Sequence, residues 1–514
     1  MKRKRTFQRV LAMVSAAVMV ASCAGCGNNA GTKNTAGNTS TAETKTEAAG
    51  ETQAEKEAGN QVLRVATATL PTTLDANASV SNAGIQVYYN IYDTLIMRDT
   101  SADTPTFLPG LAESWTQTGD LEWEFKLRDG VKFQDGTTMD ADDVCYSMNR
   151  VINNEDASYQ TANSYLLSNF EKFEAVDDLT VKAYTKNPEP LIENLLSDPN
   201  AGISSKEYCE SVGLEQAGLS PITTGPYKVV SFDPGHSVEL ERFDDYWGEK
   251  APFEKIEITC IPEIISRITA LQNGEVDFIT NIPPDQESML EGNTNVKLIG
   301  GVLPMYHVYR LNMTNELMKD SNLRAALDYA IDRQKLVDTI WHGKAVAATG
   351  YQFDEYGDLY LEGRDNEITY DVEKAKEFLA KSNYNGETVR IYNQTDYYTH
   401  ADLAAQAVIE MWKAIGVNAE LVEAESLSTF SNEEQMIRTW SNPLYYQDPM
   451  GVLERHWSPD GAQIKTGHFV ASEEYTKQFN IARYSKHAGK RLDISTTTSE
   501  RRLRLSICIN HMSP

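Results

Sequence analysis

The sequence contains few of the residues that build metal sites, disulfide frameworks and catalytic centres. Among its 514 residues are six cysteines and eight histidines. Apart from Cys23 and Cys26 the cysteines have no CxxC spacing, and the histidines have neither HxxxH nor HExxH spacing. We therefore expect no metal site and no disulfide framework. A G-x-S-x-G motif, a phosphate-binding loop and a nucleophile–base motif are also absent, so we expect no enzyme and no cofactor.

Basic residues are scarce as well. The chain has 47 Lys and Arg against 74 Asp and Glu, which leaves a net charge of −27. Nucleic-acid binding requires clustered basic residues that neutralise phosphates, so no nucleic-acid partner is expected. The acid excess is typical of a soluble protein kept dispersed by self-repulsion. With 41% apolar residues the chain can still bury a sizeable core.

The N-terminus has the pattern of an export signal. Five basic residues within residues 1–9 precede an uncharged stretch, 10–21, that is shorter than the about 20 residues of a membrane-spanning helix. The stretch ends in VASC (20–23), and small residues before a cysteine resemble the lipobox of bacterial lipoproteins. The resemblance implies cleavage before Cys23 and attachment of a lipid anchor to its sulfur. Residues 1–23 are predicted to be a lipoprotein signal peptide, with an ordinary secretory signal as the alternative.

Residues 24–60 contain no aromatic residue and no Val, Leu or Ile. Such a segment cannot bury enough apolar surface to offset the entropy lost on ordering. We expect a disordered tether that holds a folded body away from a membrane.

The folded body begins at Val62 with a strand-like alternation. In the segment 121–127, apolar residues alternate with charged ones, which predicts a half-buried strand. Asp129-Gly130 and Asp135-Gly136 predict turns after it, and Asp140 predicts a helix N-cap.

Helical and strand-like segments alternate through the rest of the body. We expect helices over 262–272, over 323–340 with a second cap at Asp332, and after a cap at Asp371. A further helix over 403–415 is expected to bury Leu403, Ala407, Val408, Met411 and Ile415 on one face. Short strands are expected at 276–279 and 417–422. The alternation predicts an α/β protein with mixed sheets in more than one lobe.

Several motifs together resemble one family. Residues 108–150 begin LPGLAESWTQTGDLEWEFKLRDG and are followed, in order, by TTGPYKV (223–229), NGEVDF (273–278), RLNMTN (310–315), the segment 323–350 and WKAIGVNAEL (412–421). This ordered set closely resembles the family 5 solute-binding proteins, the oligopeptide, dipeptide and nickel binders of ABC importers.

The resemblance implies an α/β, two-lobed periplasmic-binding-protein-like fold of type II, cluster C, with an extra inserted domain and mixed sheets. The implied parts are lobe I from 61–105 and 225–308, the inserted domain from 106–224, and lobe II from 309–482. The ligand is expected between the lobes, which close around it by hinge bending.

The implied function is capture of an oligopeptide outside the cytoplasm and its delivery to an ABC permease and ATPase complex. We expect a monomer held at the membrane by its lipid anchor. An oligosaccharide ligand is one alternative, and a surface peptide receptor or chaperone without a transport role is another. Resemblance to nickel binders also leaves a metal held through a single histidine as an alternative.

Candidate ligand-binding residues follow from the positions where the family lines its cleft. They are Tyr306, Trp440, Tyr445, Tyr446 and Asp448. Peptide binders usually carry a D-Y-x-[DE]-P motif whose aspartate pairs with the α-amino group of the ligand, and Tyr445 takes that aspartate's position here. Ordinary packing is the alternative for the aromatic residues, and a role in holding the loop is the alternative for Asp448. The segment 224–227 is expected to be a structural turn.

The last segment, 483–514, departs from the family. It holds seven Lys and Arg against Asp493 and Glu500 and has no clear helical or strand pattern. The family's last segment returns to the first lobe, which this tail does not resemble. We interpret it as a frameshifted or truncated end, with a basic interaction arm as the alternative.

Overall fold

The fold is taken from a computed structural model. It describes residues 62–484, apart from 79–81, 100–105, 154–165, 351, 361–368, 396, 460 and 466–467. The predicted signal peptide with Cys23, the tether 24–60 and residues 485–514 lie outside the described residues. In the described part of the chain, no helix combines the length and the apolar character needed to cross a membrane.

Lobe I is organised by a mixed five-stranded sheet. Its order is β11-β1-β10-β9-β8, made of β1 (Val62–Thr67), β8 (Tyr227–Asp233), β9 (Ser237–Arg242), β10 (Lys255–Cys260) and β11 (Phe278–Ile279). β1 runs parallel to both β10 and β11, whereas β9 is antiparallel to both of its neighbours. Helix α2 (Asn82–Ile91) buries Val87, Tyr88 and Ile91 in the core of this lobe. Helix α7 (Ile264–Gln272) leads into β11, close to the predicted helix 262–272 and strand 276–279, and Gly274 between them has a positive φ.

The inserted domain is an antiparallel sheet covered by a helix. Its order is β4-β5-β7-β6, made of β4 (Ala112–Gly119), β5 (Glu122–Leu127), β6 (Phe170–Asp177) and β7 (Thr180–Thr185). The predicted alternation is confirmed in β5, where Phe125 and Leu127 are buried. Helix α3 (Ala141–Ile152) begins at the predicted cap, because Asp140 accepts hydrogen bonds from the backbone of Asp142 and Asp143.

Short elements connect lobe I and the inserted domain. They are the strand pair β2 (Ile96–Asp99) and β3 (Thr106–Pro109), the helices α4 (Ile192–Leu196), α5 (Lys206–Val212) and α6 (Leu214–Leu219), and a 3-10 turn at Pro199–Ala201. The predicted turns after β5 are confirmed, since Gly130 and Gly136 both have positive φ. At Gly225 a Cβ atom would lie 2.3 Å from the backbone carbon of Ile91, so this turn requires glycine for close packing.

Lobe II is organised by a four-stranded sheet. Its order is β12-β15-β13-β14, made of β12 (Met305–Leu311), β13 (Val389–Gln394), β14 (Ala419–Ala424) and β15 (Ile437–Pro443). Its helices are α8 (Glu316–Lys319), α9 (Ser321–Tyr329), α10 (Arg333–Ile340), α11 (Val372–Lys381) and α12 (Ala401–Ala414). Asp332 and Asp371 cap α10 and α11, as predicted. Strand β12 crosses the boundary placed between residues 308 and 309.

The buried face of α12 agrees with the prediction at Val408 and Ile415 and differs from it at Leu403. Leu403 is 46% exposed, whereas Ala405, Val408 and Trp412 are buried. The indole nitrogen of Trp412 donates a hydrogen bond to the carbonyl of Leu327 at 2.9 Å. This large side chain is anchored under α9 and therefore sets the rotation of α12, which turns Leu403 outward.

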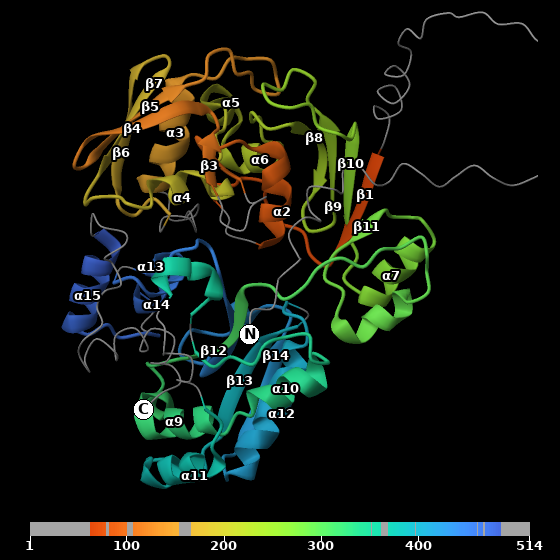
Figure 1. The fold of residues 1–514 in the computed structure, drawn as a ribbon, viewed down its shortest axis with the longest axis vertical. Helices are drawn as coiled ribbons and strands as arrows, with labels where there is room; N and C mark the ends of the chain where they lie inside the picture. Colours follow the sequence, from red (N-terminus) through yellow and green to blue (C-terminus); the bar gives the residue numbers. More distant parts are fainter. Residues whose placement is uncertain are drawn as a thin grey trace, which may run out of the picture.

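The last described segment lies between the lobe II sheet and the inserted domain and contacts both. It contains α13 (Met450–Trp457), α14 (Ala462–Lys465) and α15 (Glu473–Tyr484). Met450, Trp457 and Phe479 share one apolar core with Phe125 and Phe133 of the inserted-domain region. Figure 1 shows lobe I and the inserted domain side by side in the upper half, the lobe II sheet below, and these helices under the inserted domain. The segment thus connects the two halves of the molecule.

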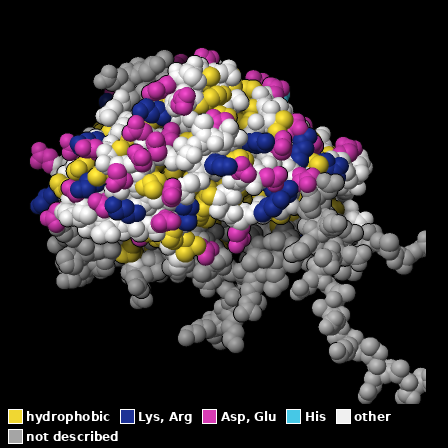
Figure 2. Space-filling view, turned by 90° about the horizontal axis from the view of Figure 1, so that it is seen from above, with side chains coloured by type: hydrophobic (Ala, Val, Ile, Leu, Met, Phe, Trp, Pro, Cys, Tyr) yellow, Lys and Arg dark blue, Asp and Glu magenta, His cyan; other side chains and the backbone are white. Residues whose placement is uncertain are grey.

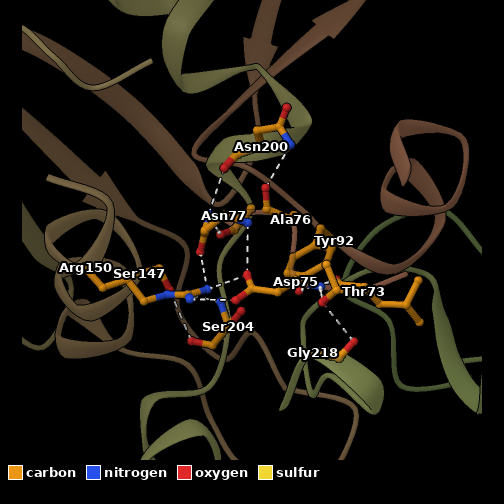
Figure 3. A network of polar contacts seen from close by, with 12 residues as sticks. Thr73, Asp75, Ala76, Asn77, Tyr92, Ser147, Arg150, Asn200, Ser204 and Gly218 are labelled. Carbon is orange, nitrogen blue, oxygen red and sulfur yellow. Dashed lines mark hydrogen bonds and ion pairs between the residues drawn. The ribbon is translucent and has the colours of Figure 1, made fainter. Parts of the chain in front are cut away.

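A buried polar network joins lobe I to the inserted domain (Figure 3). Arg150 of α3 donates hydrogen bonds to both carboxylate oxygens of Asp75 at 2.7 and 2.8 Å and to Asn77 at 2.6 Å. The side chain of Asn77 donates in turn to the carbonyl of Asn200 at 2.7 Å. Burial lowers the pKa of Arg150, but the charge of Asp75 outweighs it and leaves that pKa above its ordinary value. This acid–base pair fixes the inserted domain on lobe I.

Charged side chains of both signs cover the face seen in Figure 2. Acidic and basic groups are interspersed across the described part of that face. The net charge of −27 is therefore not gathered there into one acidic patch.

Candidate functional site

The loop that follows β15 bridges the two halves of the molecule. A guanidinium nitrogen of Arg98, on β2, donates a hydrogen bond to the carbonyl of Tyr445 at 3.0 Å. The same guanidinium lies 5.1 Å from the ring centre of Tyr446. Two of the five candidate residues therefore lie where the lobe II chain meets the strand pair beside lobe I.

Two of the candidate side chains in this loop hold it in place. Tyr446 is buried in the core shared with the inserted domain, and its ring lies against Gly451. A carboxylate oxygen of Asp448 accepts a hydrogen bond from the backbone nitrogen of Met450 at 2.9 Å. Asp448 thus holds the turn just before α13, whose N-cap is Pro449, and this contact agrees with the loop-holding alternative for the residue.

Trp440 and Tyr445 come together around a histidine of α13. The ring of His456 lies 5.9 Å from the ring of Trp440 and 5.9 Å from the ring of Tyr445. The guanidinium of Arg455 lies 4.1 Å from the centre of the Tyr445 ring. Burial, with the nearby charges of Arg455 and Arg310, lowers the pKa of His456 to about 3. The imidazole is therefore neutral near pH 7.

Tyr306 lies opposite Asn442 on the neighbouring strand and packs against the same apolar core as Tyr445, but its polar contact is a different one. Its hydroxyl donates a hydrogen bond to the carbonyl of Gln352, and its ring is 4.7 Å from that of Phe353. Both partners come from the segment after α10, so the contacts of Tyr306 fasten that segment to β12.

Two arginines in this region were not among the residues predicted from the sequence. Arg310 on β12 and Arg438 on β15 are direct cross-strand partners. Their guanidiniums lie 5.1 and 4.8 Å from the ring centre of Trp440. The available signal was the alternation of β15: Ile437 enters the lobe II core, so Arg438 and Trp440 point to the opposite face.

A second contact between the lobes lies at the 3-10 helix Pro284–Leu290. The ring of His400, before α12, bonds a carboxylate oxygen of Asp285 at 2.9 Å. Lys344 forms an ion pair with Glu287 of the same 3-10 helix. Burial raises the pKa of Asp285, but a hydrogen bond from Gln286 and the charge of His400 outweigh it and lower that pKa.

A buried charged triad ties α15 to the inserted domain. Arg483 donates two hydrogen bonds to Glu189 at 2.7 and 2.6 Å and one to Glu454 of α13 at 2.5 Å. Their side chains are at most 8% exposed. Burial raises the pKa of Glu454 to about 7, opposed by the charge of Arg483 and assisted by that of Glu189. Arg483, placed in the tail by the sequence, is thus a buried part of α15.

No metal-binding cluster is evident in the described part of the chain. No group of three or more His, Cys, Asp or Glu side chains is placed there to hold an ion. Within the same residues Cys145, Cys209 and Cys260 are free thiols. Burial raises the pKa of Cys145 to about 12, so this thiol is unreactive near neutral pH.

Comparison with known proteins identifies the family. The model of the bacterial extracellular solute-binding proteins, family 5 Middle, matches residues 106–463, more than half of the chain. The chain belongs to this family. The resemblance seen in the sequence motifs is thereby confirmed, and family 5 proteins are extracytoplasmic solute-binding components of ABC importers.

Individual relatives agree with this assignment. The glutathione-binding protein GsiB of Escherichia coli (strain K12) is 30% identical over 370 residues, which cover 70% of this chain and 69% of GsiB. The structure of DppA from Helicobacter pylori with the peptide STSA has a TM-score of 0.77 at 22% identity, covering 90% of this chain and 92% of DppA. The oligopeptide-binding protein AppA of Bacillus subtilis has a TM-score of 0.76 at 21% identity, covering 88% and 92%. The predicted two-lobed α/β fold is confirmed.

Proposed function

We propose that this family 5 protein captures an oligopeptide between lobe II and the other half of the molecule and delivers it to an ABC permease and its ATPase. The observation that carries the proposal is the segment 440–456, which contacts both halves: Trp440 pairs with β12 in the lobe II sheet, and Tyr445 and Tyr446 contact Arg98 of β2. A solute held there would be enclosed on two sides when the lobes close. The solved structures of DppA and AppA hold a tetrapeptide, STSA, and a nonapeptide, and GsiB is named for glutathione.

The position that usually recognises the amino group of the peptide carries a different residue in this chain. Tyr445 replaces the aspartate that pairs with a ligand amine, and the positive guanidinium of Arg455 lies 4.1 Å from its ring. A cation next to this position disfavours a second cation. We therefore assign no amine anchor to Tyr445 and propose that its ring, with Trp440, lines the solute. For Tyr306, Tyr446 and Asp448 we propose positioning roles.

An oligosaccharide ligand is less well supported. Sugar rings stack on exposed faces of aromatic side chains. The ring of Trp440 already has the guanidiniums of Arg310 and Arg438 within 5.1 Å of its centre. These contacts compete with a neutral sugar for the same ring.

The membrane attachment is part of the proposal. A lipid on Cys23 and the tether 24–60 would keep a monomeric receptor at the outer face of the membrane, close to its permease. Intact-mass measurement of protein from native membranes tests this. A mass that includes Cys23 with acyl chains supports the anchor, and an unmodified N-terminus rejects it.

Ligand capture is tested by tryptophan-fluorescence titration with a peptide pool and with cello- and xylo-oligosaccharides. We expect saturable quenching by peptides only, and a decrease in the radius of gyration on binding. Tyr445→Ala should weaken binding at least tenfold, whereas Tyr370→Ala, at a residue 51% exposed on lobe II, serves as the control. A response to sugars without a response to peptides would overturn the peptide assignment.

A further inference from the structure

Strained backbone in the described part of the chain gathers around one contact between the lobes. Among the described residues other than glycine, Asn281, His342 and His400 have positive φ, at 57°, 50° and 57°. Asn281 lies four residues before Asp285. His342 lies two residues before Lys344, and His400 itself bonds Asp285. The left-handed conformation is unfavourable for residues with a Cβ atom and persists where the surrounding structure imposes it, often at functional sites. Its concentration here indicates a role for this contact beyond folding.

The acidic side of the contact is fixed to lobe I. It is carried by the 3-10 helix Pro284–Leu290, whose last residue, Leu290, is buried in one apolar cluster with Ile268 of α7. The side chain of Gln272, at the end of α7, donates a hydrogen bond to the carbonyl of Met289 at 2.8 Å. The acids of this 3-10 helix therefore move with lobe I.

The basic side of the contact is fixed to lobe II. The ring of His400 lies 6.4 Å from the ring of Trp341, which in turn lies 5.7 Å from the ring of His307 on β12. The backbone nitrogen of Lys344 donates a hydrogen bond to the carbonyl of Trp341 at 2.8 Å. His400 and Lys344 thus share one support at the end of α10, and both move with lobe II.

The two bonds between the lobes respond differently to pH. Nε2 of His400 lies 2.9 Å from a carboxylate oxygen of Asp285, and Lys344 forms an ion pair with Glu287. Lysine and ionised carboxylates keep their charges between about pH 5.5 and 7.5, whereas histidine is the side chain that gains a proton as pH falls through this range. Protonation makes the hydrogen bond to a carboxylate charge-assisted and therefore stronger. One bond thus depends on pH, and the other does not.

The titratable groups that surround His400 leave this response intact. Burial raises the pKa of Asp285, but a hydrogen bond from Gln286 and the charge of His400 outweigh it, so this acid is ionised. The pKa of His307 is lowered by burial and by the charge of His400, so its ring is neutral near pH 7. Burial raises the pKa of Tyr398 to about 12, so its hydroxyl is neutral as well. The other charged or titratable groups near the contact are Asp402 in the first turn of α12, the paired Lys344 and Glu287, and the exposed His342. Among all these groups, His400 is the one that both titrates in this range and bonds across the lobes.

We propose that the 3-10 helix Pro284–Leu290 is a pH-sensitive latch, whose Asp285 binds His400 of lobe II and holds the lobes closed more firmly as pH falls. The pair of Lys344 and Glu287 aligns the two surfaces throughout this pH range. When the lobes separate, His400 loses Asp285, so the closed form binds the proton more tightly than the open form. Proton uptake and closure therefore favour each other. The inference rests on the proposed function, in which the lobes close around a solute.

The test uses the full-length, ligand-free protein and measures its radius of gyration by X-ray scattering at pH 5.5, 6.5 and 7.5 and constant ionic strength. His400→Asn removes the titrating ring and keeps a side chain that tolerates positive φ. Asp285→Asn removes the acid, and Lys344→Met removes the pair that does not depend on pH. His236→Gln is the matched control, because this histidine lies 3.6 Å from Asp233 within lobe I and bonds no other lobe.

We expect the radius of gyration of the wild type and of His236→Gln to decrease as pH is lowered from 7.5 to 5.5. His400→Asn and Asp285→Asn should lose this dependence, whereas Lys344→Met should keep it at a larger radius. Circular dichroism verifies that each variant is folded, and if one variant of the His400–Asp285 bond is misfolded, the other decides the test. A wild-type radius that does not change with pH overturns the latch, and so does a wild-type dependence that persists in His400→Asn.

Titration with the peptide STSA and with glutathione separates the latch from the proposed function. We expect the wild type to bind at least one of them about two- to fivefold more tightly at pH 5.5 than at pH 7.5, relative to the same ratio in His400→Asn, as for a partly exposed ion pair. A wild-type ratio no larger than that of His400→Asn overturns the latch while oligopeptide capture stands. A pH-dependent radius of gyration without binding of either peptide supports the latch and counts against oligopeptide capture.

Discussion

Arginine is buried beside an acid at the junction between lobe I and the inserted domain, but beside another arginine in the sheet of lobe II. At the junction Arg150 donates hydrogen bonds to one acid, Asp75, at 2.7 Å and to the amide oxygen of Asn77 at 2.6 Å. In lobe II Arg310 and Arg438 are direct cross-strand partners and meet no acid among the described residues. The pair with an acid stabilises the fold, whereas like charges opposite each other in a sheet destabilise it.

A third buried group lies between these extremes. In the triad of α13, α15 and the inserted domain, two acids share the single cation Arg483. The three groups thus form a series of one acid per arginine, two acids per arginine, and two arginines without an acid. Substitutions in these three groups are therefore expected to change the free energy of unfolding by amounts that differ in sign as well as in size.

The largest effect is expected at the junction. Arg150→Met should lower the free energy of unfolding by about 3–5 kcal/mol, because it leaves the buried Asp75 charge without a partner. Urea denaturation followed by circular dichroism measures the change. Arg64→Met, which breaks an exposed pair with Asp277, is the control and should cost about 0–1 kcal/mol. Equal losses in the two variants would show that the junction is no stronger than a surface pair.

The next effect is a pH dependence of the triad. The folded-state pKa of Glu454 is about 7 and lies above its ordinary value of 4.5. The folded state therefore binds the proton more tightly, so the contribution of Glu454 to stability is greatest below pH 4.5 and is lost as pH rises through 7. In Glu454→Gln the free energy of unfolding should therefore fall by about 1–3 kcal/mol less than in the wild type over this pH range. Thermal unfolding of both proteins between pH 4.5 and 8 measures it, and parallel curves would contradict the prediction.

A smaller effect of opposite sign is expected in lobe II. Arg438→Met should raise the free energy of unfolding of the ligand-free protein by about 1 kcal/mol, because it removes the half-buried member of a pair of opposed like charges whose other member, Arg310, is buried. Arg390→Met, in an exposed ion pair on the same sheet, should stay within about 0.5 kcal/mol of the wild type. A clear loss of stability in Arg438→Met would mean that this arginine is a structural member of the sheet.

The smallest effect is expected at the contact between the lobes. Asp285→Asn weakens its bond with His400 and should lower stability by less than about 1 kcal/mol, because the aspartate is 35% exposed. The same change should slightly increase the radius of gyration of the ligand-free protein, measured by X-ray scattering. Glu239→Gln, in a pair with Lys255 inside lobe I, is the control. An unchanged radius of gyration would show that the bond between Asp285 and His400 does not favour closure of the lobes.

Local chemistry made much of the fold predictable. Asp140, Asp332 and Asp371 cap helices as expected, since each carboxylate accepts hydrogen bonds from backbone groups within three residues. On α12 the prediction was confirmed for Val408 and Ile415 but was wrong for Leu403, because periodicity alone did not show that Trp412 would be buried in its place. A distant carbonyl, that of Leu327, fixes the indole and with it the rotation of the helix.

The amino-acid order alone was enough to indicate the family, the α/β class and the capped helices, because these depend on neighbours along the chain. Three-dimensional packing was needed to oppose Arg310 to Arg438 and to bury Arg483 between Glu189 and Glu454. Strand register and helix docking bring together residues that are 128 and 294 positions apart, and no local pattern encodes such pairs. The pairing of Arg310 with Arg438 therefore follows only from the assembled sheet of lobe II.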